Sequence, residues 1–265
     1  MSFEVLLSAM HLKDETYVDS LNIVSDTVVI NQCDTESFSD IERESKEGNI
    51  HKVRFICSKK RGLSISRNMA VLNSNADICI LCDNDVEYVR GYETVIKRAY
   101  ERHPDADLIV FFIKRKERGK PLSDRDMRMN YYTVSKIFSP EISFKRESIR
   151  GISFNENFGA GAKYILGEEN IFLYDCLKAK KKIYYVPEKI AELREEESTW
   201  FEGYNERFFI SRGANFTAMS RPFAFLFILQ FAIRKRKLYI DTMPFMKAVS
   251  LMLKGKKEYE DFCDR

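Results

Sequence analysis

Two aspartates one residue apart, Asp83 and Asp85, are the residues of this chain whose type and spacing best fit a chemical role. They follow the unbroken apolar run 78–82, which is typical of a strand buried on both faces of a parallel sheet. Open α/β sheets bind ligands at the carboxyl ends of such strands. Hard carboxylate oxygens there suit Mg²⁺ or Mn²⁺ carrying a phosphate. The alternative is a polar turn, because Asp and Asn are common turn residues.

The surrounding sequence predicts the elements that would position this pair. Alternating strands and helices imply parallel βαβ units, so the carboxyl ends of the strands share one edge. We expect Asp34, the basic loop 59–61, Arg67 and the aspartate pair near that edge. The cations could hold the phosphates of a nucleoside diphosphate, and Asp34 could accept a hydrogen bond from its base or ribose. Taken alone, Arg67 could instead be a helix-surface arginine. For Lys59 and Lys60 a solvated loop is the favoured interpretation. The predicted strands are 5–10, 28–32, 53–57, 78–82, 108–112, 141–146 and 183–187, and the helices lie around 17–23, 66–72 and 92–100. The charged stretch 114–135 is expected to be irregular.

Composition limits the classes of protein to consider. The chain has 265 residues, 45% hydrophobic and 31% charged, with a net charge of +3. These values indicate a globular protein with a proper core, and the small net charge does not indicate nucleic-acid binding. Cys79 and Cys82 form one C-x-x-C pair without a second, so we expect buried structural thiols in a reducing cytosol rather than a metal site. We expect neither a signal peptide nor a transmembrane segment.

Four sequence blocks occur in the order seen in a known family. They are Leu-Leu-Ser-Ala-Met at 6–10, Asn-Gln-Cys-Asp at 31–34, Arg-Gly-Leu-Ser-Ile-Ser-Arg-Asn at 61–68 and Asp-Asn-Asp at 83–85. Together they resemble the nucleotide-binding half of a family 2 glycosyltransferase of the GT-A fold. The resemblance implies a divalent cofactor, Mn²⁺ or Mg²⁺. It implies metal binding by Asp85 with Asp83, and nucleotide binding by Ser8, Ala9, Asp34, Gly62, Arg67, Asp83 and Asn84.

An acidic pair, Glu168 and Glu169, opens a predicted helix after the glycine-punctuated loop 154–162. Acidic side chains are favourable in any first helical turn, so a purely structural role is an alternative. The loop and the pair resemble the acceptor half of the same family. The resemblance implies that Glu169 is the catalytic base and that Glu168, Gly161 and Trp200 lie on the acceptor side. The family usually has Glu-Asp where this chain has Glu-Glu.

The family's late metal-binding histidine, expected shortly before Ser-Thr-Trp at 198–200, is absent, and Leu193-Arg194 stands near its place. Three interpretations remain. The metal could be held by Asp85, the diphosphate and water. Arg194 could act as a fixed cation instead. The protein could also be catalytically impaired.

The resemblance implies an α/β GT-A domain with a mixed, mostly parallel central sheet over residues 1–215. Residues 1–112 would form its nucleotide-binding half and 113–215 its acceptor half. The segment 216–265 predicts a helical extension: an apolar stretch at 222–233, the basic run 234–237, and a helix opened by Pro244 and closed by Lys254, Lys256 and Lys257. Apolar faces beside clustered cations suit an anchor on anionic lipid. The alternative is packing on the catalytic domain or in a homo-oligomer.

The resemblance implies inverting, metal-dependent transfer of a hexosyl group from a nucleotide sugar, with UDP favoured, to a glycan acceptor. The expected acceptor is lipid-linked, at the cytoplasmic face of the plasma membrane. In bacteria this setting serves cell-envelope or capsular polysaccharide synthesis. One alternative is an inactive nucleotide-sugar-binding partner of another glycosyltransferase. A nucleotidyltransferase ranks last. Such an enzyme normally has a glycine-rich loop directly after its first strand, and residues 10–13 contain no glycine.

Overall fold

The computed structural model describes residues 1–45, 48–116, 118–194 and 201–264. The chain divides into two compact units. The first comprises Met1–Arg61, Ile65–Ser153 and Cys176–Glu196, and the second comprises Gly62–Ser64, Phe154–Asp175 and Glu197–Arg265.

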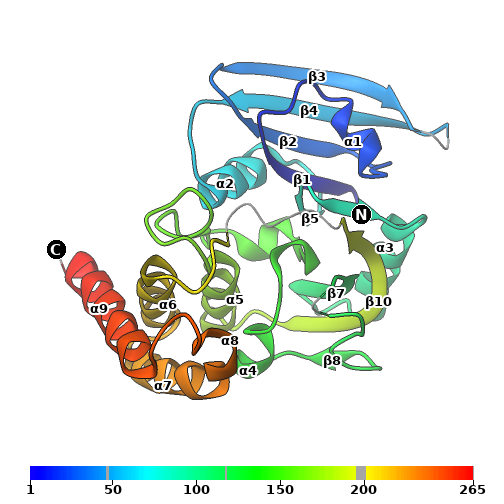
Figure 1. Ribbon diagram of the computed structural model, residues 1–265. Helices are drawn as coiled ribbons and strands as arrows, with labels where there is room; N and C mark the ends of the chain where they lie inside the picture. The colour runs from blue at the N-terminus through cyan, green and yellow to red at the C-terminus, as the bar shows by residue number, and fades with distance from the viewer. Residues whose placement is uncertain (46–47, 117, 195–200, 265) are drawn as a thin grey trace. The chain divides into compact units, whose positions relative to one another are not determined.

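Within the described residues, the first unit contains a ten-stranded mixed sheet with the order β3-β4-β2-β1-β5-β9-β7-β10-β6, and β8 pairs with β10 (Figure 1). β4, β2, β1 and β5 are parallel neighbours, as are β7 and β10, while β9 runs antiparallel to both β5 and β7. Six strands therefore point the same way, which confirms the mixed, mostly parallel sheet. The strands are β1 (Phe3–Met10), β2 (Thr27–Gln32), β3 (Ser37–Glu44), β4 (Ile50–Ser58), β5 (Ile78–Asp83), β6 (Val86–Tyr88), β7 (Leu108–Lys114), β8 (Met127–Arg128), β9 (Ile142–Lys145) and β10 (Ile183–Leu193).

Helices of the first unit bury apolar faces against this sheet. In α3, Tyr92, Ile96 and Tyr100 recur at helical spacing and are buried in the same cluster as the core of β1 and β5. The first two residues of α2 belong to the second unit. The helices are α1 (Tyr17–Ser20), α2 (Leu63–Asn73), α3 (Tyr92–Arg102) and α4 (Tyr131–Val134), with 3₁₀ turns η1 (Ser139–Glu141) and η2 (Arg146–Ile149).

The two cysteines of the C-x-x-C pair lie inside β5 and are buried free thiols, as expected. Burial raises the pKa of Cys79 to about 12 and raises that of Cys82 well above its ordinary value. Both thiols are therefore protonated near neutral pH and act as core side chains.

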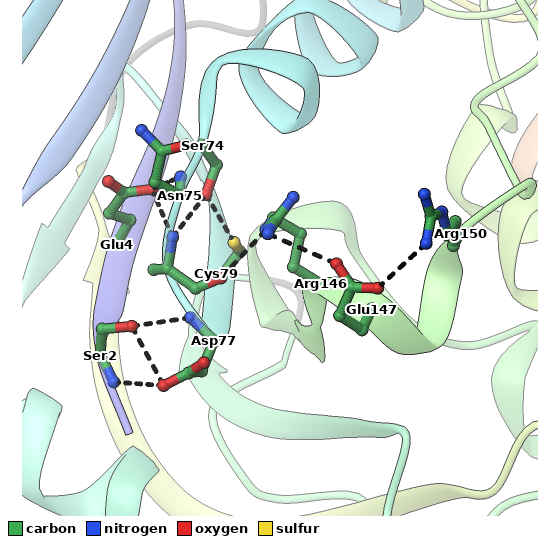
Figure 2. Close-up of polar contacts among 10 residues, drawn as sticks. Ser2, Glu4, Ser74, Asn75, Asp77, Cys79, Arg146, Glu147 and Arg150 are labelled. Atoms are coloured by element: carbon green, nitrogen blue, oxygen red, sulfur yellow. Dashed lines mark hydrogen bonds and ion pairs between the residues drawn. The ribbon is translucent and has the colours of Figure 1, made fainter.

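Polar side chains tie together the amino-terminal ends of β1 and β5 (Figure 2). The backbone N–H and hydroxyl of Ser2 donate to Asp77, at 2.8 and 3.1 Å. Glu4 accepts from the Ser74 hydroxyl and, at 3.0 Å, from the Asn75 N–H. These polar groups hold the two strands in register. They lie at the opposite end of β5 from Asp83 and Asp85.

Three features of the first unit differ from the sequence-based prediction. β3 was not predicted, and the stretch 114–135, expected to be irregular, contains β8 and α4. β10 continues past Pro187, where the predicted strand ends, to Leu193, with shifts in its register against β7 between Val186 and Lys189 and again before Ala191. Proline has no N–H to donate to the ladder, so it is tolerated at such an irregularity.

In the second unit, α6 and α9 lie side by side (Figure 1) and cross at very close range. A Cβ on Gly213 would lie 1.8 Å from the Met252 carbonyl oxygen, and one on Gly255 would lie 1.9 Å from that of Ile210. Both glycines are therefore required by the backbone contact. The helices are α5 (Glu168–Lys178, in this unit through Asp175), α6 (Glu206–Met219), α7 (Ala224–Arg234), α8 (Arg236–Tyr239) and α9 (Phe245–Cys263), with the 3₁₀ turn η3 (Arg221–Phe223).

The expectation that Lys254, Lys256 and Lys257 close the last helix is wrong, because α9 continues to Cys263. Its extra turns bury Tyr259, whose hydroxyl accepts a hydrogen bond from the Asn155 side chain at 2.9 Å and whose ring packs edge-on against Phe158. The tertiary contact thus extends the helix beyond its charged segment. Among the described residues, none of the helices combines the length and the apolar character needed to cross a bilayer.

Candidate active site

Four neighbouring strands of the first unit bring polar residues to one edge of the sheet. β4, β2, β1 and β5 are parallel, so their carboxyl ends lie together. Ser8 lies in register with Asp83, and Ala9 with Asn31. The buried Asn31 side chain bonds the backbone N–H and C=O of Leu12, at 2.8 and 3.0 Å, and fixes the chain where it leaves β1. The edge predicted from the sequence therefore exists.

Arg67 of α2 is a buried cation at this edge. Its side chain is only 1% exposed, and Nη2 donates to both carboxylate oxygens of Asp83, at 3.0 and 3.3 Å. Beside it on the same helix, the Ser66 hydroxyl bonds the Ser8 hydroxyl at 2.8 Å. Arg67 is therefore no surface arginine: α2 carries a positive charge into the sheet edge and holds Asp83 in place.

Asp34, directly after β2, is paired with Arg61. The distance from Arg61 Nη2 to Asp34 Oδ1 is 2.6 Å, and Arg61 Nη1 also donates to the carbonyls of Cys33 and Ser58, at 2.9 and 3.1 Å. Arg61 thus fixes the loop that carries Asp34, whose side chain remains 88% exposed. Lys59 and Lys60 are exposed, in agreement with a solvated loop.

The Asp-Asn-Asp segment forms a turn between β5 and β6 that two distant residues hold. The Tyr17 hydroxyl donates to the Asn84 carbonyl at 2.9 Å, and the Arg194 N–H donates to the Asp85 carbonyl at 2.8 Å. The Arg194 guanidinium donates to the Ser20 carbonyl and, at 3.4 Å, to Glu87. Arg194 therefore lies beside the turn, and its charge is directed to Glu87 and the α1 backbone.

The donor set at this turn fits a divalent cation that also binds a diphosphate. Asp83 and Asp85 supply hard oxygen ligands, and Asp83 already bonds the Arg67 cation. Among the described residues no three His, Cys, Asp or Glu side chains cluster as a metal cage. Mg²⁺ commonly binds through one or two carboxylates plus substrate phosphates and water, and two carboxylates suffice for that arrangement.

The acidic pair of the second unit opens α5, as predicted. Glu168 is 5% exposed, while Glu169 is partly exposed. Gly159 has a φ of +103°, and a Cβ on it would lie 3.2 Å from the Glu168 carboxyl carbon. The loop therefore packs directly on Glu168, whereas Glu169 is the more accessible carboxylate of the pair.

Helix α6 holds the backbone that leads into this pair. The Asn215 side chain donates to the Gly167 carbonyl at 2.9 Å, and the Ser211 hydroxyl accepts from the Ile165 N–H at 3.2 Å. Both side chains are completely buried. Two polar residues one helical turn apart therefore fix the segment immediately before Glu168.

A third residue of α6, Arg212, is a partly buried cation on the same helix. Burial lowers the pKa of its guanidinium, and the negative charge of Glu169 is the largest influence opposing that shift. The guanidinium carbon lies 5.4, 5.8 and 5.4 Å from the ring centres of Phe208, Phe216 and Phe231. Arg212 therefore places a positive charge, held among aromatic rings, in the electrostatic surroundings of Glu169.

Gly62, predicted to bind nucleotide, and Gly161, predicted on the acceptor side, meet inside the second unit. A Cβ on Gly161, which has a φ of +79°, would lie 3.4 Å from the Gly62 Cα. Next to them, the Leu63 N–H donates to the Ala160 carbonyl at 2.9 Å. Trp200 lies outside the described residues. The remaining predicted nucleotide-binding residues belong to the first unit.

Residues 23–163, more than half of the chain, match the family model described as Glycosyl transferase family 2. The chain belongs to glycosyl transferase family 2. No curated protein matches the sequence significantly. Asp34, Arg67, Asp83 and Asp85 lie inside the matched region, and Glu168 and Glu169 lie just beyond it.

Solved structures show the fold of this family 2 chain. The S. aureus TarS structure in complex with UDP has a TM-score of 0.59 and 12% identity, over 91% of this chain and 74% of that one. The mannosyltransferase PcManGT from Pyrobaculum calidifontis, in complex with GDP-Man and Mn²⁺, has a TM-score of 0.52 and 10% identity, over 96% and 86%. At such identities the likeness shows a shared fold, here GT-A.

Several residues around the family 2 candidate site were not predicted as contacts. Tyr17 and Ser66 lie in segments predicted only as helices, and no sequence signal marked them. In the sequence, Asn215 and Arg212 could have been noticed only as polar residues on an otherwise apolar face of α6. Buried polar groups of that kind normally have a partner, which was the available signal.

Proposed function

We propose that this family 2 chain transfers a hexosyl group from a nucleotide sugar to a glycan acceptor, releasing a nucleoside diphosphate and inverting the anomeric centre. The observation that carries the proposal is the meeting of Ser8, Arg67 and Asp83 at the carboxyl edge of a parallel sheet. UDP is the favoured carrier, since TarS is seen with UDP and with UDP-GlcNAc, while the GDP-Man complex of PcManGT keeps GDP a candidate.

On the donor side, Ser8, Ala9 and Asp34 would contact the base, and Gly62, Asp83 and Asn84 the rest of the nucleotide. The exposure of the Asp34 carboxylate, 88%, leaves it accessible to a ligand while Arg61 holds its loop. The buried cation of Arg67 would favour the diphosphate. Buried charges bind phosphate strongly when no water competes for them.

Asp85, with Asp83, would hold Mn²⁺ or Mg²⁺. Such an ion, when bound, neutralises the charge that develops on the departing diphosphate. Asp83 shares its carboxylate with Arg67, so we assign Asp85 the larger part in metal binding. The Arg194 guanidinium, directed to Glu87 and Ser20, would hold the turn rather than replace the metal.

On the acceptor side, Glu169 would act as general base. Its carboxylate takes the proton of an acceptor hydroxyl as that oxygen attacks the anomeric carbon, and the bond from this carbon to the diphosphate oxygen breaks. A single displacement of this kind inverts the configuration. Glu168, buried against Gly159, would orient the loop 154–162. Gly161 and Trp200 would line the site of the acceptor.

We further propose a lipid-linked glycan as acceptor, at the inner face of the plasma membrane, as in bacterial cell-envelope polysaccharide synthesis. The apolar and basic helices of segment 216–265 support this setting and also leave a homo-oligomer contact as a second role for them. In this proposal 1–112 forms the nucleotide-binding half and 113–215 the acceptor half of the catalytic domain.

A second candidate is a catalytically impaired nucleotide-sugar-binding partner of another glycosyltransferase. The observation that favours it is Arg194, which stands near the place of the family's histidine and is engaged with Glu87 and Ser20.

The two candidates differ in their products. Purified protein is incubated with Mn²⁺, a bacterial lipid extract as the source of lipid-linked acceptor and, separately, UDP-glucose, UDP-galactose, UDP-GlcNAc and GDP-mannose. The nucleotides released are identified by chromatography. Metal-dependent release of a nucleoside diphosphate is the result expected of a transferase. Pyrophosphate would instead indicate nucleotidyl chemistry, and donor binding without any release would establish the inactive partner.

A further inference from the structure

Helix α7 of the second unit has two apolar faces, and only one of them is covered. Ala224, Ile228 and Ala232, at spacings of four residues, are completely buried, and Ile228 and Ala232 belong to the hydrophobic core of the helices. At 100° per residue, Leu226 and Ile233 fall on the opposite side. Their exposed fractions are 59% and 65%. A surface helix normally presents polar residues there, so this face requires a different explanation.

The exposed apolar surface extends beyond these two residues. Phe223, directly before α7, is 57% exposed, Phe225 is 52% exposed, and Leu238 of α8 is 55% exposed. We call Phe223, Phe225, Leu226, Ile233 and Leu238 the α7–α8 surface. Large exposed apolar side chains scattered singly are ordinary, but five of them within residues 223–238 are a concentration that marks an interaction site.

The charge of this segment is one-sided. Residues 221–240 contain five Lys and Arg and no Asp or Glu, while the whole chain has a net charge of only +3. Four of these cations form the run 234–237, and all four are exposed. In the described part of the chain, Arg221 pairs with Asp264, whereas no acidic side chain lies within ion-pair distance of the run 234–237.

We propose that the α7–α8 surface binds an anionic lipid bilayer, with its apolar side chains inserted between the lipids and the run 234–237 on the headgroups. Amphipathic helices with cations beside a large apolar face lie in the membrane interface in this way. A symmetric contact between two copies would place the same cations of both copies close together, and their repulsion disfavours that occupant. The proposal rests on the membrane setting of the proposed function, but the two are tested separately, because lipid binding needs neither donor nor acceptor sugar.

The test is co-sedimentation of the whole chain with vesicles of phosphatidylcholine and phosphatidylglycerol, or of phosphatidylcholine alone. We expect the wild type to sediment with the anionic vesicles, to stay in the supernatant with the neutral ones, and to be released by high salt, because salt screens surface charges. Leu226→Gln/Ile233→Gln and Lys235→Gln/Lys237→Gln should each lower the partition coefficient by about tenfold or more. All four residues are exposed, so circular dichroism should show unchanged folding.

Matched controls separate this surface from general stickiness. Leu72→Gln removes an exposed leucine that is 82% accessible on α2, and Lys13→Gln/Lys120→Gln removes two exposed lysines elsewhere. Neither should change sedimentation. Equal recovery of wild type in the supernatant with and without anionic vesicles would overturn the proposal. Equal binding of all variants to anionic vesicles would also overturn it. So would light scattering that shows a stable dimer or protein complex in the wild type but not in the two α7–α8 variants.

Discussion

The side-chain amide of Asn215 donates a hydrogen bond of 2.9 Å to the backbone carbonyl of Gly167. Gly167 has a φ of +87°, and a Cβ on it would lie 2.2 Å from the Asn215 amide nitrogen. The next residue, Glu168, begins α5. This pair therefore links a buried helix to the turn that opens the acidic pair, and the missing side chain of glycine is required for the link.

Gly167→Ala should destabilise the protein by more than about 2 kcal/mol, because a side chain at positive φ costs about 1–2 kcal/mol and the clash with Asn215 adds to it. Urea unfolding followed by circular dichroism measures the loss. Gly151→Ala is the control, since Gly151 has a φ of +81° with no atom within 4 Å of its added Cβ, and it should show the conformational cost alone. Equal losses in the two variants would contradict the role of Asn215.

Glu169→Gln should lower the rate of nucleoside-diphosphate release by about 10²- to 10⁴-fold, the usual contribution of general-base catalysis. Glu168→Gln should have a smaller effect, because Glu168 is buried against Gly159 and keeps its shape as glutamine. The rates are compared on whichever sugar donor is turned over, with thermal melting to confirm folding. A larger loss for Glu168→Gln would reverse the two assignments.

The effects of substituting Arg67 and Asp83 on the free energy of unfolding should be strongly coupled. Arg67→Met leaves the mostly buried Asp83 carboxylate without its cation and should cost about 3 kcal/mol. The double variant with Asp83→Asn should recover part of that loss in a double-mutant cycle. Lys182→Met breaks an exposed pair with Asp105 at 3.0 Å and should cost less than about 1 kcal/mol. Comparable losses in the two single variants would contradict the buried role of Arg67.

Cys33, the residue before Asp34, should report on nucleotide binding. A hydrogen bond from the Thr35 hydroxyl lowers the pKa of the Cys33 thiol, so its reactive thiolate persists to lower pH than in an ordinary cysteine. The rate of its alkylation by iodoacetamide should reach half its maximum at a lower pH than the rate of alkylation of free cysteine does. UDP with Mn²⁺ should slow this labelling.

Exposed Cys263 serves as the internal control for that experiment, because it lies in the second unit, on the last residue of α9. Its labelling should be unaffected by UDP. The four buried cysteines, 57, 79, 82 and 176, should label only on unfolding. Unchanged Cys33 labelling at saturating UDP would place the nucleotide elsewhere.

Much of the first unit could be predicted because its strands are buried on both faces. Runs such as 78–82 are apolar throughout, and that signal needs no knowledge of partners. β3 lacks it, since Phe38 and Ile41 are its only large apolar residues and Phe38 is 60% exposed. An edge strand paired on one side derives its stability from β4, which the local sequence does not reveal.

Helix ends were predictable where capping was local. Asn130 and Thr133 form a capping box at α4, and this short signal was present in the sequence although the stretch was expected to be irregular. The end of α9 depends on Tyr259, which bonds Asn155 over one hundred residues away. Nothing near Tyr259 in the sequence indicates that contact.

The places of the candidate residues in the fold were predictable, but their pairings were not. Asp34, Arg67 and Asp83 were identified from their positions after strands or on the following helix. That Arg61 binds Asp34, and that Arg67 is buried against Asp83, depends on side-chain reach across the sheet edge. Sequence spacing cannot give such distances, because several cations lie close enough along the chain to pair with the same aspartate.

The central claim is that the turn at Asp85 holds a metal ion carrying a nucleoside diphosphate. Calorimetric titration of UDP, with Mn²⁺ present or removed by chelator, tests it without requiring an acceptor. The wild type should bind UDP at least about tenfold more tightly with Mn²⁺, Asp85→Asn should lose that gain, and Glu87→Gln, two residues away, should keep it. Equal Mn²⁺-dependent affinity in the wild type and Asp85→Asn would contradict the account.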